Sequence, residues 1–365
     1  MTDNPKNAFV TGLAQWFAQS HRPLPWKGEK DPYLIWLSEI ILQQTRVEQG
    51  LPYFERFREN FPDVQALADA PEDLIMKNWE GLGYYSRARN LHAAAKHVAY
   101  ELGGHFPDTY EGIRALKGVG PYTAAAIASF AYELPRAVVD GNVYRVLARY
   151  FGIATPTDTT AGKKEFASLA QQLLELNPEL PSRHNQAMMD FGATHCTPRA
   201  PRCATCPLQP HCAAYAADEV ARLPVKSKKI RKKRRYFHYL VINQGEEVLL
   251  QKRTEKDIWQ NLYEFPLLEQ AAAETGEEAL RASELWQRLL GGANAQVLQI
   301  SRPFQQTLTH QYIQAVFWEV SLPEEATLPN SAPFVRAKRK NLSKFAFPKI
   351  IDWYLRDNSL YLKLV

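Results

Sequence analysis

Residues 116–124 read Leu-Lys-Gly-Val-Gly-Pro-Tyr-Thr-Ala and introduce an alanine-rich stretch that favours helix. Gly118 and Gly120 lack Cβ atoms, so backbone amides here, including that of Val119, can approach an anion closely. The helix that follows adds its dipole and its free N–H groups. The stretch therefore predicts a hairpin between two helices that binds a phosphate of a nucleic-acid backbone, with an ordinary helix–helix turn as the alternative.

The chain around this hairpin is expected to be helical up to about residue 217. Residues 34–49 are apolar enough for one long buried helix, with Ile35, Glu39 and Leu42 on the same face. The other expected helices span residues 90–102, 122–131, 143–150 and 186–191.

The pattern becomes β-rich in the C-terminal part. Strands are expected at residues 236–242, 247–252, 295–300 and 312–320, with one helix at about 277–290. The chain of 365 residues is therefore expected to form an all-α domain over residues 1–217 and an α+β domain over residues 236–365.

A basic connector over residues 218–235 separates the two expected domains. Residues 226–235 (KSKKIRKKRR) contain basic residues and no acidic ones, and they account for the net charge of +5. This composition allows a polyanionic partner, and a solvated linker is the alternative. No apolar run is long enough for a membrane span and the N-terminus does not resemble a signal peptide, so a cytoplasmic location is the default.

All four cysteines fall within residues 196–212. They are Cys196, Cys203, Cys206 and Cys212. A cytoplasmic address disfavours disulfides, and four thiols on one short loop are typical of metal binding. The thiolates suit either tetrahedral zinc or a 4Fe–4S cluster, and their spacing leaves both open.

Two carboxylates are candidates for chemistry. Glu39 lies within an apolar helix, where burial would raise its pKa and make it a proton donor near neutral pH; a salt bridge with Arg46 is the structural alternative. Asp140 follows an apolar stretch and precedes an expected helix, so an N-cap role is its alternative.

Six stretches occur in an order that resembles the MutY family of adenine DNA glycosylases, which belongs to the helix-hairpin-helix superfamily together with endonuclease III. They are WLSEIILQQT from Trp36, GLGYYSRARNL from Gly81, the hairpin at 116–123, VDGNV from Val139, NQAMMD from Asn185 and the cysteine loop. The resemblance is dense over about residues 8–217. It implies a glycosylase that removes adenine mispaired with 8-oxoguanine or guanine, and it favours a 4Fe–4S cluster over zinc.

The family's chemistry implies a role for each matching residue. Glu39 would protonate N7 of the flipped adenine, and Asp140 would stabilise the oxocarbenium-like sugar that remains. Asn142 would orient Asp140, and Tyr122 would support the cationic sugar. Endonuclease III-like lyases have a lysine nucleophile where this chain has Tyr122, so the resemblance implies a monofunctional enzyme.

Further residues match positions that contact DNA in this family. The adenine pocket would contain Arg22, Leu24, Trp26 and Gln186, with core packing as the alternative for Leu24. Gln44 and Tyr84 would insert into the duplex. The hairpin residues Gly118, Val119 and Gly120 would meet phosphates, as would the cysteine-loop cations Arg199 and Arg202.

Residues 236–365 resemble the family's Nudix-like domain, which recognises 8-oxoguanine. The matching segment is Leu308, Thr309 and His310, where leucine replaces the usual aromatic residue and an ordinary strand histidine is the alternative for His310. The acidic stretch at residues 274–278 does not supply a complete Nudix motif, so no nucleotide hydrolysis is expected.

The expected partner is double-stranded DNA with an adenine mispair, bound by a monomer, with the connector either touching DNA or only tethering the domains. Two other hypotheses remain open: a pyrimidine-specific endonuclease III-like enzyme, and a non-catalytic Fe–S protein that binds DNA. The residue at position 122 and the C-terminal domain argue against the first, and the pair Glu39 and Asp140 argues against the second.

Overall fold

The computed structural model describes residues 4–20, 22–177, 180–227, 232–272, 276–328 and 333–357. The chain folds into two compact units. One comprises residues 1–69 and 90–229, and the other comprises residues 70–89 and 230–365. The division at residue 229 falls inside the expected basic connector, of which residues 228–231 lie outside the described part of the chain.

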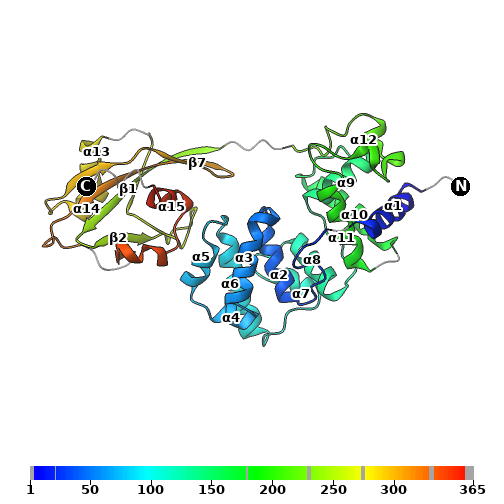
Figure 1. The fold of residues 1–365 in the computed structure, drawn as a ribbon, viewed down its shortest axis with the longest axis horizontal. Coiled ribbons are helices and arrows are strands. Elements are labelled where there is room, and N and C mark those ends of the chain that lie inside the picture. Colours follow the sequence, from blue (N-terminus) through cyan, green and yellow to red (C-terminus); the bar gives the residue numbers. More distant parts are fainter. Residues whose placement is uncertain are drawn as a thin grey trace. The chain divides into compact units, whose positions relative to one another are not determined.

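The first unit is helical, as the sequence predicts (Figure 1). Its helices are α1 (Pro5–Gln19), α2 (Pro32–Leu42), α3 (Val47–Asn60), α4 (Val64–Asp69), most of α6 (Ser86–Lys96), the π-helical turn η1 (His97–Glu101), α7 (Tyr110–Ala115), α8 (Pro121–Tyr132), α9 (Gly141–Phe151), α10 (Thr160–Glu175), α11 (Pro181–Thr194), η2 (Cys203–Thr205), η3 (Gln209–His211) and α12 (Ala213–Ala216).

The expected single helix over residues 34–49 is wrong. Helix α2 ends at Leu42, and α3 begins at Val47 after a turn in which Gln44 has a φ of 57°. A left-handed residue interrupts the α-helical hydrogen-bond pattern, and periodicity alone does not reveal it. The break leaves Ile35, Glu39 and Leu42 on one face of α2, as expected, and all three line the same cavity.

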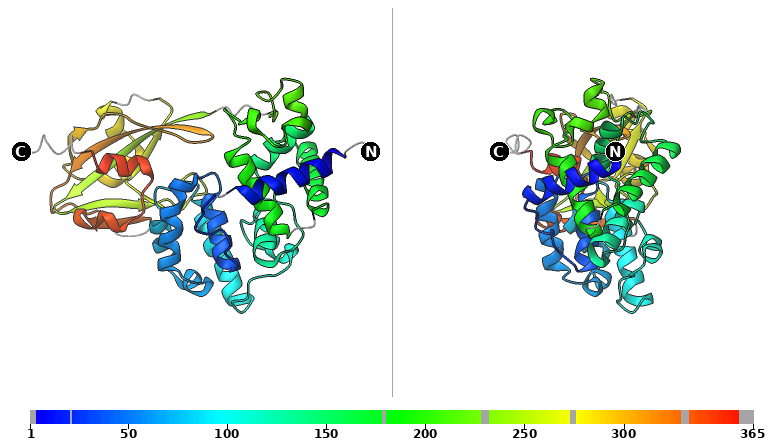
Figure 2. Two further views of the ribbon diagram at one scale, coloured as in Figure 1. Left: turned by 45° about the vertical axis from the view of Figure 1, so that its right-hand side comes forward. Right: turned by 90° about the vertical axis from the view of Figure 1, so that its right-hand side faces the viewer.

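The core of the first unit lies among α1, α9, α10 and α11. Figures 1 and 2 show α9, α10 and α11 side by side with α1 packed against them. The fully buried side chains there include Phe9, Leu147, Phe166 and Phe191. Burial of such side chains is the main stabilising contribution, at about 1.5–3 kcal/mol each.

The second unit contains a mixed sheet and α5 (Glu72–Trp79). Its long strands β1 and β7 are parallel, with Lys233 opposite Gln311 at one end. The described strands are β1 (Lys233–Gln244), β2 (Glu247–Lys252), β3 (Tyr263–Glu264), β4 (Leu267–Gln270), β5 (Gln296–Ile300), β6 (Phe304–Thr307), β7 (Gln311–Ser321) and β8 (Phe334–Lys338).

Four of these strands confirm the sequence prediction, and the expected helix over residues 277–290 is two helices. They are α13 (Glu277–Arg281) and α14 (Glu284–Leu290). Ser283 is the N-cap of α14, and its hydroxyl accepts the Trp286 N–H. Short strands β3, β4, β6 and β8, the turn η4 (Arg339–Lys344) and α15 (Lys349–Leu355) were not expected. Segments of two to seven residues are too short for a clear period.

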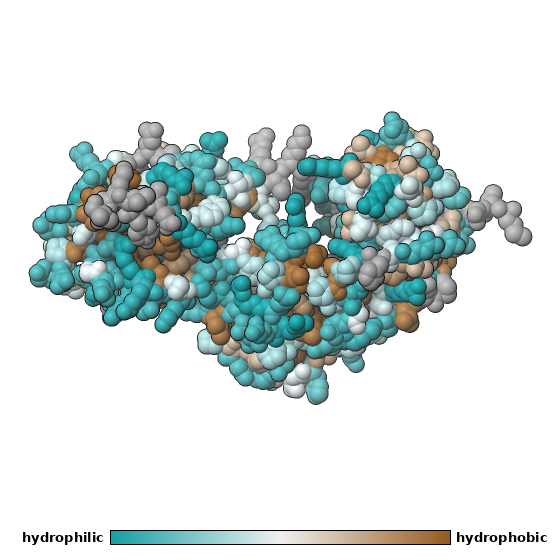
Figure 3. Space-filling view, viewed as in Figure 1, coloured by the Kyte–Doolittle hydropathy of each residue, from teal (hydrophilic) through white to brown (hydrophobic). Residues whose placement is uncertain are grey.

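The surface of the described residues is mostly hydrophilic. Figure 3 shows apolar residues in small separate groups on the face that it presents. Within the described part of the chain, no helix combines the length and the apolar character that crossing a bilayer requires.

The predicted hairpin lies between α7 and α8, which pack together. Gly118 has a φ of 82°, and a Cβ atom there would lie 2.7 Å from Cβ of Asn90. Gly120 is the N-cap of α8 with a φ of −86°, and a Cβ atom added to it would meet no neighbouring atom within 4 Å. The two glycines therefore have different functions: close packing requires the first, and the second faces open space.

We expect Gly118→Ala to lower the free energy of unfolding by about 1–3 kcal/mol, because it adds both a left-handed Cβ and a steric overlap. Gly120→Ala is the matched control and should change it by less than about 0.5 kcal/mol. Urea denaturation of both variants measures the difference. Equal stability of the two variants would contradict the proposed packing requirement.

Candidate active site

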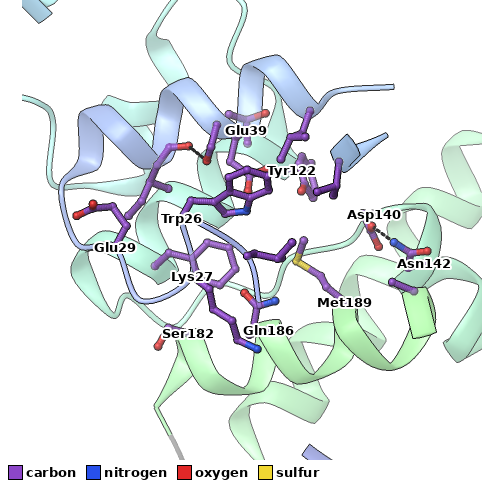
Figure 4. Close-up of a pocket in the computed structure, with 18 of the residues that line it drawn as sticks. Trp26, Lys27, Glu29, Glu39, Tyr122, Asp140, Asn142, Ser182, Gln186 and Met189 are labelled. Atoms are coloured by element: carbon purple, nitrogen blue, oxygen red, sulfur yellow. Dashed lines mark hydrogen bonds between the residues drawn. The ribbon is translucent and has the colours of Figure 1, made fainter. Parts of the chain in front are cut away.

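A cavity of about 730 Å³ lies entirely within the first unit. It is lined by α2, by the start of α8 and of α9, by one face of α11, and by the segment 22–30 between α1 and α2 (Figure 4). Its volume lies in the range of about 300–1,000 Å³ that is typical of ligand sites. Glu39, Tyr122, Asp140 and Asn142 all contribute to its lining.

Glu39 lies on the apolar helix α2 and is 7% exposed. Burial raises the pKa of Glu39 to about 7, and a hydrogen bond with Tyr122 opposes part of this increase. The alternative partner Arg46 lies beyond the end of α2, as the N-cap residue of α3. The helix break therefore removes the two-turn spacing on which the Arg46 alternative depended, and Tyr122 is the side chain that hydrogen-bonds to Glu39.

Tyr122 is the second residue of α8, directly after Pro121 at the first helical position. Burial raises the pKa of the Tyr122 hydroxyl well above its usual value, as do the nearby carboxylates Glu39 and Asp140. The phenol therefore keeps its proton and donates a hydrogen bond to the Glu39 carboxylate. Figure 4 shows the two side chains next to each other at one end of the cavity.

Asp140 is the N-cap of α9, which confirms the structural alternative for this residue. Its Oδ1 accepts the Val143 N–H at 2.8 Å, and its Oδ2 accepts from Asn142 Nδ2 at 2.7 Å. Burial raises the pKa of Asp140, and these two hydrogen bonds lower it. Capping and cavity lining occur together, because the same N-terminus of α9 faces the cavity (Figure 4).

A buried amide fixes the segment that leads to Asp140. Asn185 on α11 accepts the Val138 N–H at 2.9 Å and donates to Ser129 on α8 at 2.8 Å. It also donates to the carbonyl of Arg136 at 2.9 Å. Because Asn185 is only 2% exposed, these bonds replace those that water would otherwise make, and α8, α11 and the segment before α9 are linked at one point.

Helices α9 and α11 approach each other closely behind Asn142. A Cβ atom on Gly192 would lie 2.6 Å from Cβ of Asn142, so only glycine fits there. Arg145 Nη2 donates to Asn142 Oδ1 at 2.8 Å and to the Gly192 carbonyl at 2.6 Å, while its Nε donates to the carbonyl of Cys196 at 2.7 Å. Hydrogen bonds thus connect Asp140, through Asn142 and Arg145, to the first cysteine of the loop.

The residues expected around a flipped base also reach this cavity. Arg22, Leu24, Trp26 and Gln186 line it and are half-buried. The core-packing alternative for Leu24 is not what the structure shows, since Leu24 lies outside the buried core. Gln44 lines the cavity as well, but it is exposed and has the left-handed φ described above.

The three predicted hairpin residues lie together, but not every backbone amide among them is available to bind a phosphate. The Val119 N–H donates to the Leu116 carbonyl at 3.0 Å, so this amide is already engaged within the turn, and Val119 is buried. Gly120 lines the cavity as the N-cap of α8. Arg199 and Arg202 lie elsewhere, as exposed cations on the cysteine loop.

The four cysteines line one hollow and none forms a disulfide. The hollow also contacts Arg149, whose Nη1 donates to Cys196 Sγ at 3.4 Å. Among the described residues, no three His, Cys, Asp or Glu side chains are arranged to hold a single metal ion. Four thiols around one hollow suit either tetrahedral zinc or a 4Fe–4S cluster.

The second unit contains the segment expected to recognise the lesion. Thr309 and His310 occupy the turn between β6 and β7, which closes through a 2.8 Å bond from the Leu308 N–H to the Gln311 carbonyl. His310 is exposed in this turn, so the ordinary strand alternative does not apply. Tyr84 belongs to the same unit, is 45% exposed, has a φ of 49°, and its hydroxyl lies 2.6 Å from Thr309 Oγ1.

The polar residues behind the cavity were not among the site residues predicted from the sequence. Asp190 binds Arg22 and Lys27, and Glu133 binds Lys30. The signal for Asp190 was present in the sequence, because an acidic residue four positions after Gln186 lies on the same face of a helix. Glu133 has a φ of 52° at the end of α8, and no sequence pattern marks it.

Comparison with known proteins is consistent with this arrangement. Residues 37–172 match the HhH-GPD superfamily base excision DNA repair protein family, and residues 238–357 match the NUDIX domain. A thermostable thymine-DNA glycosylase superposes with a TM-score of 0.55 at 29% identity, over 59% of this chain and 99% of that one. A trapped endonuclease III–DNA covalent intermediate superposes with a TM-score of 0.50 at 22% identity, over 57% of this chain and 94% of that one. At this identity the likeness indicates the fold alone.

Curated relatives extend the match. An adenine DNA glycosylase of Buchnera aphidicola subsp. Acyrthosiphon pisum is 34% identical over 262 residues, which cover 72% of this chain and 74% of that protein. The adenine DNA glycosylase of Mus musculus is 43% identical over 217 residues, which cover 57% and 42%. The chain, with an endonuclease III-like helical domain followed by a Nudix-like domain, belongs to the adenine DNA glycosylase family.

Proposed function

We propose that this enzyme removes adenine mispaired with 8-oxoguanine or guanine, by hydrolysis of the N-glycosidic bond after the base has left the duplex stack. The observation that carries the proposal is the meeting of a protonatable carboxyl, Glu39, and a second carboxylate, Asp140, in one cavity large enough for a nucleoside. Cleavage of a glycosidic bond commonly uses such a pair.

Glu39 is proposed as the general acid. Neutral adenine leaves poorly as an anion, and protonation at N7 makes it a better leaving group. A carboxyl with a pKa of about 7 still holds its proton in a large fraction of molecules at neutral pH. Tyr122 donates to Glu39 and fixes its orientation toward the base.

Asp140 is proposed to stabilise the cationic sugar. The Val143 N–H and Asn142 each occupy one oxygen, so the carboxylate has a fixed orientation before the reaction begins. A preorganised negative charge stabilises positive charge as it develops and requires no rearrangement at that moment. Asn142 and the arginine behind it, Arg145, keep the carboxylate in place.

The enzyme is proposed to be monofunctional. A lyase needs an uncharged amine to attack the sugar, and position 122 holds a tyrosine. The cavity lysines Lys27 and Lys30 are both bound to carboxylates, at 3.1 and 2.6 Å. Each of these amines is therefore already engaged with a carboxylate.

Arg22, Leu24, Trp26 and Gln186 are proposed to receive the flipped adenine. The indole of Trp26 offers a stacking face, and the amide of Gln186 can pair with the adenine edge. Gln44 and Tyr84 are proposed to fill the gap left in the duplex. Both are exposed and have left-handed backbones, which are uncommon in non-glycine residues and often mark functional positions.

The cysteine loop is proposed to bind a 4Fe–4S cluster through Cys196, Cys203, Cys206 and Cys212. When bound, the cluster would cross-link the loop, and analysis of iron and acid-labile sulfide tests this assignment. The loop then presents Arg199 and Arg202 to phosphates, as the hairpin presents Gly118 and Gly120. The proposed partner is double-stranded DNA, bound by a monomer in the cytoplasm.

Thr309, His310 and Leu308 are proposed to recognise 8-oxoguanine in the strand opposite the adenine. A hydroxyl and an exposed imidazole at the tip of a turn can bond the oxidised edge of the base, which guanine lacks. The Tyr84 hydroxyl lies 2.6 Å from Thr309 Oγ1. This contact would hold the turn beside Tyr84, which is itself proposed to enter the duplex.

The decisive experiment is single-turnover cleavage of duplexes with adenine opposite 8-oxoguanine, guanine or thymine. We expect alkali-dependent cleavage at adenine opposite 8-oxoguanine and guanine only. Asp140→Asn should reduce the rate by at least about 10²-fold and retain mispair binding, because it removes charge and little volume. Absence of excision by the iron-replete protein, or selective cleavage at a damaged pyrimidine, would refute the proposed function.

The raised pKa of Glu39 also predicts a pH-dependent stability. The folded protein holds this proton up to about pH 7 and the unfolded chain releases it near pH 4.5, so the stabilisation is complete below pH 4.5 and is lost as the pH rises through 7. Glu39→Gln should remove this dependence, which amounts to about 3 kcal/mol. Urea denaturation of both proteins at pH 5 and pH 8 measures the free energy of unfolding. The same change with pH in the unaltered protein and in Glu39→Gln would contradict the raised pKa.

His310→Ala should reduce the preference for 8-oxoguanine over guanine by about 5- to 20-fold, the worth of one or two hydrogen bonds. Excision opposite guanine should not change. Gln305→Ala, an exposed residue on β6 of the same hairpin, is the matched control. An unchanged preference in the His310 variant would move lesion recognition to another segment.

A further inference from the structure

We propose that Asp190 is a positioning residue of the adenine pocket, which binds Arg22 and Lys27 and thereby fixes the segment 22–30 that carries Trp26. This inference rests on the proposed function, since it concerns the site in which adenine would bind. Asp190 does not line the cavity itself, so it would act through the two cations.

The geometry around Asp190 is that of a buried three-charge cluster. Arg22 Nη1 lies 2.9 Å from Oδ1, and Lys27 Nζ lies 3.1 Å from Oδ2, so each carboxylate oxygen binds one cation. Asp190 is 1% exposed, whereas its two partners are partly exposed and line the cavity. A carboxylate in this position requires the cations, because an unpaired buried charge is strongly unfavourable.

Besides the Asp190 cluster, the segment 22–30 is held by the edge-to-face packing of Trp26 against the ring of Phe54, with centroids 5.6 Å apart. It contains turns but no regular helix or strand, and the backbone bonds of these turns are local, from the Lys27 N–H to the Leu24 carbonyl and from the Glu29 N–H to the Trp26 carbonyl. Arg22 and Lys27 lie on either side of Trp26 in the sequence. One carboxylate therefore fixes both ends of the stretch that holds the indole.

The same carboxylate relates the two sides of the pocket. Asp190 follows Gln186 by four residues on α11, so the two side chains lie on one face, one turn apart. Figure 4 shows Lys27 and Gln186 at the same end of the cavity, with Trp26 between Lys27 and Tyr122. The distance across the pocket from Trp26 to Gln186 thus depends on the cations that bind Asp190.

A second ion cluster attaches the far end of the segment. Lys30 Nζ lies 2.6 Å from Glu133 at the end of α8, and Glu133 also accepts from the Ser182 N–H and Oγ at 3.1 and 2.7 Å. The segment is therefore attached to both α8 and α11. Glu133 is partly exposed, so its pair contributes less than the buried one, and Asp190 is the dominant attachment.

Asp190 also balances charge beside the reaction. Without its carboxylate, two cations would face the cavity in which the proposed chemistry places one positive charge, first on the N7-protonated base and then, as the bond breaks, on the sugar. Loss of the negative charge would therefore act twice, by releasing the segment and by opposing the developing positive charge.

Asp190→Asn tests this, because the amide keeps the shape and removes the charge. The measured quantities are the single-turnover excision rate at saturating enzyme, the Kd for a duplex with uncleavable 2′-deoxy-2′-fluoroadenosine, and the melting temperature. We expect the rate to fall by about 30- to 100-fold, as misplacement of binding groups does, with Kd changed less than about threefold. A rate within threefold of the unaltered enzyme would overturn the proposal.

Glu264→Gln is the matched control for loss of a buried ion pair. Glu264 is 1% exposed, lies 2.6 Å from Arg253 in the second unit, and should lose stability with an unchanged excision rate. An equal loss of rate per folded molecule in this control would show that Asp190 is merely structural, and would overturn the proposal.

Lys27→Gln completes a double-substitution cycle. If Asp190 acts through Lys27, the double variant should be no slower than Asp190→Asn alone. A rate loss in the double variant equal to the product of the two single losses would contradict the proposal. If Asp190→Asn does not fold, Lys27→Gln alone tests the proposal. Its excision rate should fall by at least about 10-fold. A rate within threefold of the unaltered enzyme would overturn the proposal. Absence of excision by the unaltered enzyme would instead refute the proposed function.

Discussion

The site depends on the burial of the Glu39 carboxyl in the apolar helix α2. Desolvation is the largest influence on its pKa, which lies at about 7, and the hydrogen bond with Tyr122 offsets only part of the shift. The cost of burial is tolerated because the protonated carboxyl and the Tyr122 hydroxyl satisfy each other. The start of α8 must therefore lie against the middle of α2, and the hairpin before α8 determines where that start is.

Helix termini place most of the chemistry. Tyr122 lies in the first turn of α8 and Asp140 caps α9, so both side chains follow directly from where a helix begins. Their relative position is set by contacts behind the cavity, in which Asn185 links α11 to α8 and Gly192 allows α9 to approach α11. Fully bonded polar groups at these points make the arrangement rigid, since alternative packings would leave them unsatisfied.

The loops that line or flank the sites are attached by charge rather than by regular structure. Buried Asp190 binds two cations of the segment 22–30, and in the second unit Arg235 binds Asp257 and Glu269. Arg235 was expected to belong to the basic connector, but it lies in β1 with a side chain only 10% exposed. Part of the basic run is therefore structural.

Periodicity, composition and motif order were enough to predict the two-part architecture, the family resemblance and the candidate residues Glu39, Tyr122 and Asp140. These signals are local properties of the chain and need no knowledge of its packing. Three features emerged only from the folded chain: α2 ends before Arg46, Tyr122 is the partner of Glu39, and Asp190 holds the segment beside Trp26. Each of them depends on side chains that are distant in sequence or on a single left-handed residue, and burial, which sets their energies, exists only after the helices have packed.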